Sequence, residues 1–245
     1  MVKDWFGQWF DSPYYHILYQ NRDYKEASLF IDHLIDELHI NESHHVMDLA
    51  CGKGRHSIYL NQKGFHVTGL DLSRQNIEAA KTFENDRLSF HIHDMRDVFR
   101  VDAFDFVLNL FTSFGYFDND ADNMKSIDGM AKALKPGGSL VLDFLNPHVV
   151  IDQMVPEAIK TIGGIEFHIT KSYRDGYILK DIIFEADGKQ HHYQEKVRAI
   201  TKDVFLNYFE KAGLDVVSSF GNYELDPYVS SQSDRMIFIA KNTVN

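Results

Sequence analysis

The sequence has little of what marks a secreted or membrane protein. Cys51 is the single cysteine among 245 residues, so no disulfide can form within the chain. No apolar run approaches the roughly 18 residues that a bilayer-spanning helix needs. The opening residues mix aromatic and acidic side chains without a clean apolar segment, which argues against a secretory signal. We therefore expect a cytoplasmic protein with no membrane partner.

Positive charge is also scarce. Lys and Arg total 25 against 36 Asp and Glu, which gives a formal net charge of −11. Nucleic acid is held largely through its phosphates by Lys and Arg, so this balance argues against a nucleic-acid partner, although a local basic patch could coexist with an acidic whole. Hydrophobic residues make up 44% of the chain, as expected of a globular protein with a proper core.

Strand and helix patterns alternate through the first half of the chain. Short β-branched or apolar runs predict strands at residues 44–50, 65–71, 88–94, 103–111 and 139–145. The segments between them predict helices at 55–64, 73–84 and 121–138, with Ser73 as an N-cap. Such alternation is typical of βαβ units, in which a parallel sheet is wound on both faces by helices.

The pattern differs on both sides of this region. Residues 15–40 are predicted to be helical, and residues 166–200 show three extended runs split by the turn signals RDG and ADGK, which predict an antiparallel meander. A helix at 201–213 and strands at 214–224 and 235–242 then resume the earlier pattern.

We therefore predict an α/β fold with a doubly wound, Rossmann-like, mostly parallel seven-stranded sheet. It should end in an antiparallel hairpin and contain an inserted antiparallel meander. The expected divisions are an N-terminal helical lid at 1–40, a Rossmann-like core at 41–147, the inserted meander at 148–199, and the completion of the core sheet at 200–245.

The stretch VMDLACGKGRHSIYL, residues 46–60, passes from strand to helix through two glycines. It fits the dinucleotide motif G-x-G-x-x-G only partly, because Ser57 stands at the third glycine position. The pattern D-x-A-x-G-x-G describes it better, with Asp48, Ala50, Gly52 and Gly54. Small residues let the backbone pass close beneath a ligand, and a carboxylate beside it tolerates a cationic ligand better than a pyrophosphate.

Two more acids follow the next two predicted strands. Asp71 ends the second strand, where a carboxylate can accept hydrogen bonds from both hydroxyls of a ribose. Asp94 ends the third, where it can accept from an adenine amino group while the Met95 amide reaches a ring nitrogen. Three acids therefore lie at the carboxyl edge, where open α/β sheets bind ligands.

The glycine loop, the two spaced acids and the LKPGGSLVLD segment, in this order, resemble the class I S-adenosylmethionine-dependent methyltransferases. The resemblance covers about residues 15–145 plus the closing strands and implies S-adenosyl-L-methionine as the cofactor. The segments YHILYQNRDYKEA and NLFTSFGYF, with the meander, are similar to small-molecule enzymes that dimethylate amino sugars. That similarity implies that Tyr15 and Tyr19 close over the cofactor and that the segment after the fourth strand lines the transfer site.

The expected function is transfer of a methyl group to a small-molecule amine or hydroxyl. The cofactor-binding residues that follow are Tyr15, Tyr19, Asp48, Ala50, Gly52, Gly54, Asp71, Leu72, Asp94, Met95, Asn109, Leu110 and Phe111. Because the sulfonium methyl is already electrophilic, a base is needed only for an acceptor that arrives protonated. Tyr116, His148 and His192 are the candidates for that base.

Two other functions stay open from the sequence. A tRNA or other nucleic-acid methyltransferase is one, although the chain has NLFTSF where an adenine-amine enzyme would carry Asp/Asn-Pro-Pro-Tyr. A module that binds the cofactor or its product without chemistry is the other. No metal is expected, because no H-E-x-x-H motif occurs among the 13 histidines. The oligomeric state is open, with a homodimer as one expectation.

Overall fold

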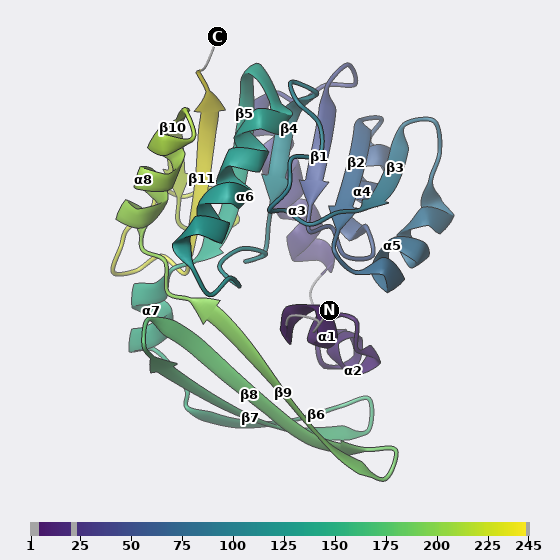
Figure 1. Ribbon diagram of the computed structural model, residues 1–245, viewed down its shortest axis with the longest axis vertical. Helices are drawn as coiled ribbons and strands as arrows, with labels where there is room; N and C mark the ends of the chain where they lie inside the picture. Colours follow the sequence, from purple (N-terminus) through teal and green to yellow (C-terminus); the bar gives the residue numbers. More distant parts are fainter. Residues whose placement is uncertain (1–4, 21–23, 244–245) are drawn as a thin grey trace.

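Seven strands form the central sheet of the computed structural model, which describes residues 5–20 and 24–243 (Figure 1). The strands are β1 (His45–Leu49), β2 (His66–Asp71), β3 (Leu88–Ile92), β4 (Phe104–Asn109), β5 (Leu134–Leu145), β10 (Leu214–Phe220) and β11 (Arg235–Asn242). Their order is β10-β11-β5-β4-β1-β2-β3, and β11 runs antiparallel to both of its neighbours while the others pair in parallel. The predicted mostly parallel sheet with a terminal antiparallel hairpin is confirmed.

Helices cover both faces of this sheet. On one face pack α3 (Tyr24–Leu38), α4 (Arg55–Gln62) and α5 (Arg74–Ala80), through side chains such as Phe30, Leu60 and Ile77. On the other pack α6 (Asp120–Ala133) and α8 (Lys202–Lys211), through Ile127 and Phe205. The sheet is therefore buried on both sides, which is the arrangement that parallel strands require.

The helix ends follow from local chemistry. Ser73 caps α5 by accepting a hydrogen bond from the Asn76 amide, as predicted. The helix predicted at 121–138 instead ends at Ala133, so its predicted end was wrong. Leu134 is extended, and Pro136 has no amide hydrogen with which to continue the helix, so the Lys-Pro-Gly-Gly segment belongs to β5.

The meander forms a second, four-stranded antiparallel sheet in the order β6-β7-β8-β9 (Figure 1). Its strands are β6 (Glu157–Ile162), β7 (Ile165–Arg174), β8 (Tyr177–Ala186) and β9 (Lys189–Arg198), and α7 (Pro147–Asp152) precedes them. The prediction of three strands missed β6. This edge strand buries none of its residues fully, so its sequence carries no alternation of apolar and polar positions.

Two short helices, α1 (Trp5–Phe10) and α2 (Pro13–Leu18), lie between the two sheets (Figure 1). Trp9 and Leu18 are buried there against Phe167 and Ile182 of the second sheet. The helix expected over 15–40 is thus represented by α2 and α3, while residues 21–23 lie outside the described part of the chain. No helix within residues 5–20 and 24–243 has the length and apolarity needed to cross a bilayer.

Candidate functional site

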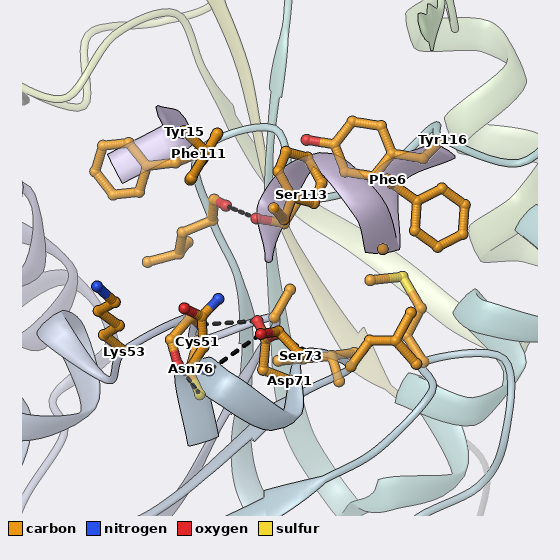
Figure 2. Close-up of a pocket in the computed structure, with 18 of the residues that line it drawn as sticks. Phe6, Tyr15, Cys51, Lys53, Asp71, Ser73, Asn76, Phe111, Ser113 and Tyr116 are labelled. Atoms are coloured by element: carbon orange, nitrogen blue, oxygen red, sulfur yellow. Dashed lines mark hydrogen bonds between the residues drawn. The ribbon is translucent and has the colours of Figure 1, made fainter. Parts of the chain in front are cut away.

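A cavity of about 480 Å³ lies between the carboxyl ends of β1, β2 and β4 and the helices α1 and α2. This volume is typical of small-molecule sites. Figure 2 shows Asp71, Ser73 and Asn76 on one side of the cavity, and Tyr15 and Tyr116 on the other. The two sides differ in chemistry. One is built from backbone turns and carboxylates, and the other from aromatic rings.

The loop after β1 turns sharply because three alternate residues adopt left-handed backbone. Ala50, Gly52 and Gly54 have φ values of 64°, 58° and 80°. No atom lies within 4 Å of the point where a Cβ on Gly52 would be, so this glycine leaves open space in the cavity lining. A Cβ on Gly54 would meet the Phe90 ring at 2.6 Å. Gly54 is therefore required for packing against β3.

Asp71 ties this loop to β2. Its Oδ2 accepts the Gly52 amide at 2.8 Å, and its Oδ1 accepts the Ser73 amide at 2.8 Å. Burial raises the pKa of Asp71 above its ordinary value, although the two amide hydrogen bonds oppose the shift. A carboxylate offers about four acceptor positions, so beyond the two amides and the nearby Asn76 side chain Asp71 keeps capacity for a ligand hydroxyl.

Asp48 is the most deeply buried carboxylate of the cavity, with 2% of the residue exposed. Desolvation raises its pKa from 3.8 to about 6, against the opposing 2.6 Å hydrogen bond from the Ser57 hydroxyl. Ionised Asp48 is therefore costly in the unliganded protein. A cation bound beside it would lower that cost.

Asp94 carries its own counterion. Arg96 donates from Nε to Oδ1 at 3.0 Å and from Nη2 to Oδ2 at 2.5 Å, and the Arg96 amide also reaches Oδ1. Burial opposes ionisation of Asp94, but these contacts outweigh it and hold the pKa of Asp94 below its usual range. The carboxylate lines the cavity as an anion.

A buried ion pair shapes the segment that follows β4. Asp143 on β5 is fully buried, and its Oδ1 lies 2.8 Å from Nε of Arg235 on β11. The other oxygen accepts the Phe111 amide at 2.7 Å, and Arg235 Nη2 donates to the Thr112 hydroxyl at 2.9 Å. Phe111 and Thr112 both have left-handed backbone, with φ of 57° and 59°, which is strained for a β-branched residue such as Thr112. The Asp143–Arg235 pair holds that strained turn.

The turn delivers the aromatic side of the cavity, which continues into α1 and α2. Ring centroids of Tyr116 and Phe10 are 5.4 Å apart, those of Phe10 and Tyr15 are 5.0 Å apart, and those of Tyr15 and Tyr19 are 4.9 Å apart. Phe6 stacks beside Tyr116 at 6.2 Å. These five residues all line the cavity and form what we call the aromatic wall.

Most of the predicted site residues line the cavity. They are Tyr15, Tyr19, Asp48, Ala50, Gly52, Asp71, Leu72, Asp94, Met95, Leu110, Phe111 and Tyr116.

Four predicted residues do not line it. Gly54 faces Phe90, and Asn109 is buried and donates from Nδ2 to the Leu49 carbonyl. His148 is exposed on α7, and His192 is exposed on β9, where it contacts Asp181 at 2.8 Å. The structure therefore places neither histidine in the lining of the cavity. Their positions in the sequence could not show which face of α7 or β9 they occupy.

Several lining residues were not predicted. His16 and Asn76 are two of them, and their Nε2 and Oδ1 atoms are buried without a hydrogen-bond partner in the described part of the chain. Lys53 follows Gly52 in the loop and could have been included on its position alone. Glu195 comes from β9, and no motif in the sequence indicates that the meander reaches the cavity.

These features fit an adenosine that carries an amino acid. Asp71 keeps acceptor capacity for a ligand hydroxyl, Gly52 leaves room where a side chain would stand, and the buried His16 Nε2 and Asn76 Oδ1 atoms offer further polar contacts. Asp48 suits the cationic part of such a ligand. The residues that would hold S-adenosylmethionine are therefore present in one cavity.

Comparisons with known proteins agree with this geometry. Residues 46–138 match the family model described as a methyltransferase domain. The Bacillus subtilis protein YqeM is 36% identical over 110 residues, and the alignment covers 44% of this chain and 44% of that protein.

Solved structures match over nearly the whole chain. An S-adenosylmethionine-dependent methyltransferase from Clostridium acetobutylicum superimposes with a TM-score of 0.78 at 20% identity, covering 93% of this chain and 95% of that one. CalS10 is an amino pentose methyltransferase from Micromonospora echinaspora that was solved with S-adenosylmethionine bound. It superimposes with a TM-score of 0.72 at 19% identity, covering 94% of this chain and 97% of that one. These structures confirm the predicted α/β fold, and the family model agrees with the predicted methyltransferase domain over residues 46–138.

Replacing Asp71 should weaken cofactor binding. Asp71→Ala removes a charged acceptor for two ligand hydroxyls and also frees the Gly52 amide, so we expect S-adenosylhomocysteine to bind about 10- to 100-fold more weakly. Isothermal titration calorimetry measures this directly. Asp86→Ala, at an exposed acid outside the cavity lining, is the matched control and should bind like the wild type. Unchanged affinity in Asp71→Ala would remove Asp71 from the site.

Replacing Asp48 should stabilise the unliganded protein at neutral pH. Its folded pKa of about 6 lies above the ordinary 3.8, so its contribution to stability is complete below pH 3.8 and is lost as the pH rises to about 6. Asp48→Asn cannot ionise, so it avoids this loss of stability. Its free energy of unfolding at pH 7 should exceed that of the wild type by about 2–3 kcal/mol. Denaturant unfolding at pH 4, 5, 6 and 7 should show the advantage growing with pH. An advantage independent of pH would contradict the assignment.

Proposed function

Because residues 46–138 match a methyltransferase domain, we propose that the whole chain uses S-adenosylmethionine to methylate a small-molecule amine or hydroxyl. The single observation that carries this proposal is the shape of the cavity. Its aromatic wall and the contribution of β9 enclose one side, while the glycine loop, Asp71 and Asp94 occupy the other. The acceptor would therefore enter a compartment roofed by α1 and α2 that suits a small, partly apolar molecule.

When bound, S-adenosylmethionine supplies an electrophilic methyl group on a positively charged sulfur. The protein's own contribution is to orient the acceptor and to exclude water. Phe6, Phe10 and Tyr15 line the cavity from α1 and α2, and their apolar rings would do the latter. The Tyr116 hydroxyl donates a hydrogen bond to the Thr112 carbonyl. With its hydroxyl held in this way, Tyr116 forms part of the wall of the acceptor compartment.

We also propose that the predicted divisions have distinct tasks. Residues 41–147 bind the cofactor, and residues 200–245 complete the core sheet through β10 and β11. Residues 1–40 contribute the lid through α1 and α2, and residues 148–199 contribute the outer wall of the acceptor compartment through β9. This division is supported by the lining of the cavity, to which α1, α2 and β9 all contribute. An amino pentose methyltransferase of similar fold makes an amine a reasonable first class of acceptor to test.

Transfer should be found in a small-molecule fraction. We expect S-adenosylmethionine labelled in its methyl group to label small primary amines or their hydroxyl counterparts, and not bulk tRNA, when each is incubated with the protein. Asp71→Ala is the matched variant, and its rate should fall at subsaturating cofactor. Label in tRNA alone would replace the proposal with nucleic-acid methylation. Tight binding of S-adenosylhomocysteine without label in any fraction would favour a module without chemistry.

A further inference from the structure

A hydrogen-bonded cluster joins β9 to α1 and the end of α2. Glu195 Oε1 accepts from the indole nitrogen of Trp9 at 2.8 Å and from the Tyr19 hydroxyl at 2.5 Å. Lys180 Nζ lies 3.3 Å from Glu195 Oε2 and also donates to the Tyr19 hydroxyl. Only 17% of the Glu195 side chain and 17% of the Lys180 side chain are exposed. We call these four residues the Glu195 cluster.

The acidic member of the cluster, Glu195, lies at the cavity, and the basic member, Lys180, lies farther from it. Glu195 and Tyr19 line the cavity, whereas Lys180 and Trp9 stand outside its lining. Lys180 Nζ lies over the Tyr19 ring, 4.6 Å from the centroid. Glu195 is therefore available to a ligand in the cavity. The ammonium group of Lys180, which lies outside the lining, neutralises part of its charge.

Glu195 has capacity for one more donor. A carboxylate offers about four acceptor positions, and Trp9, Tyr19 and Lys180 occupy three of them. The remaining position is on Oε2. The three donors also fix the side chain, so the free position is held in place before a ligand arrives.

The surroundings of Glu195 favour a cation. Tyr19 and Tyr15 continue from it into the aromatic wall, and aromatic faces attract ammonium groups. Among the described residues that line the cavity, Glu195 is the carboxylate outside the glycine loop and the predicted cofactor set. The cations of the lining, Lys53 and Arg55, belong to the glycine loop and the start of α4.

We propose that Glu195 binds the methyl acceptor as an ammonium ion, which makes the substrate class small primary or secondary amines that are protonated at neutral pH. This inference rests on the proposed function and narrows it. A protonated nitrogen has no lone pair, so its proton must leave before transfer. Glu195 Oε2 takes that proton: one N–H bond breaks, one O–H bond forms, and a neutral amine and a neutral carboxyl result. The lone pair then forms the N–C bond as the methyl–sulfur bond breaks, and that bond's electrons stay on sulfur.

The test compares two probes of the same shape and different charge. Cyclohexylammonium and cyclohexanol are titrated into the protein saturated with S-adenosylhomocysteine at pH 7. We expect the wild type to bind the ammonium at least about tenfold more tightly. Glu195→Gln should lose this preference, because its amide can still accept from Trp9 and Tyr19 but carries no charge. Asp181→Asn is the matched control and should keep it, since this acid of β8 contacts His192 and Gln194 away from the cavity.

Two binding results would overturn the inference: equal or tighter binding of cyclohexanol by the wild type, or an undiminished preference in Glu195→Gln. If Glu195→Gln fails to fold, the wild-type ratio decides. Turnover separates this inference from the function on which it rests. Methylation of hydroxyl compounds but not of the matching amines overturns the role of Glu195 and leaves the proposed function standing. No methylation of any small molecule overturns the proposed function itself.

Discussion

The buried pair between Asp143 and Arg235 is the constraint on which the site depends. It joins β5 to β11 at the carboxyl edge of the sheet and fixes the strained turn at Phe111 and Thr112. Removing one partner of such a pair leaves an uncompensated charge in the interior, which typically costs about 3–5 kcal/mol. Because the turn carries Phe111 and leads into Tyr116, the position of the aromatic wall depends on an interaction that no ligand needs to touch.

Negative charge is the second organising feature. Asp48, Asp71, Asp94 and Glu195 line one cavity, and each is held differently: by a serine hydroxyl, by backbone amides, by an arginine, and by a lysine with two aromatic donors. Burial raises the pKa of Asp48 and Asp71, so these two carboxylates are destabilised without a ligand. These carboxylates lower the stability of the unliganded protein, and a cationic ligand that binds beside them restores part of that stability.

The sequence predicted the parts that local chemistry decides. The alternation of strands and helices, the D-x-A-x-G-x-G loop and the acids after β2 and β3 all arise from short-range patterns, and Asp71 indeed meets Gly52. The rest depends on contacts between distant segments. Arg235 reaches Asp143 across 92 positions, and Tyr19 reaches Glu195 across 176, so no local pattern indicates either pair. The edge strand β6 was missed for another reason, since its exposed residues carry no alternation of apolar and polar positions, and the sequence could not show that His148 and His192 occupy exposed faces.

The central claim is that an adenosine lies across the carboxyl edge of the sheet with its ribose on Asp71 and its sulfur toward the aromatic wall. A crystal structure of the protein with S-adenosylhomocysteine tests it most directly. We predict both ribose hydroxyls at about 2.6–3.2 Å from the Asp71 oxygens and the thioether sulfur facing the compartment beside Tyr19 and Glu195. A ribose placed away from Asp71, or a sulfur turned away from that compartment, would contradict the account.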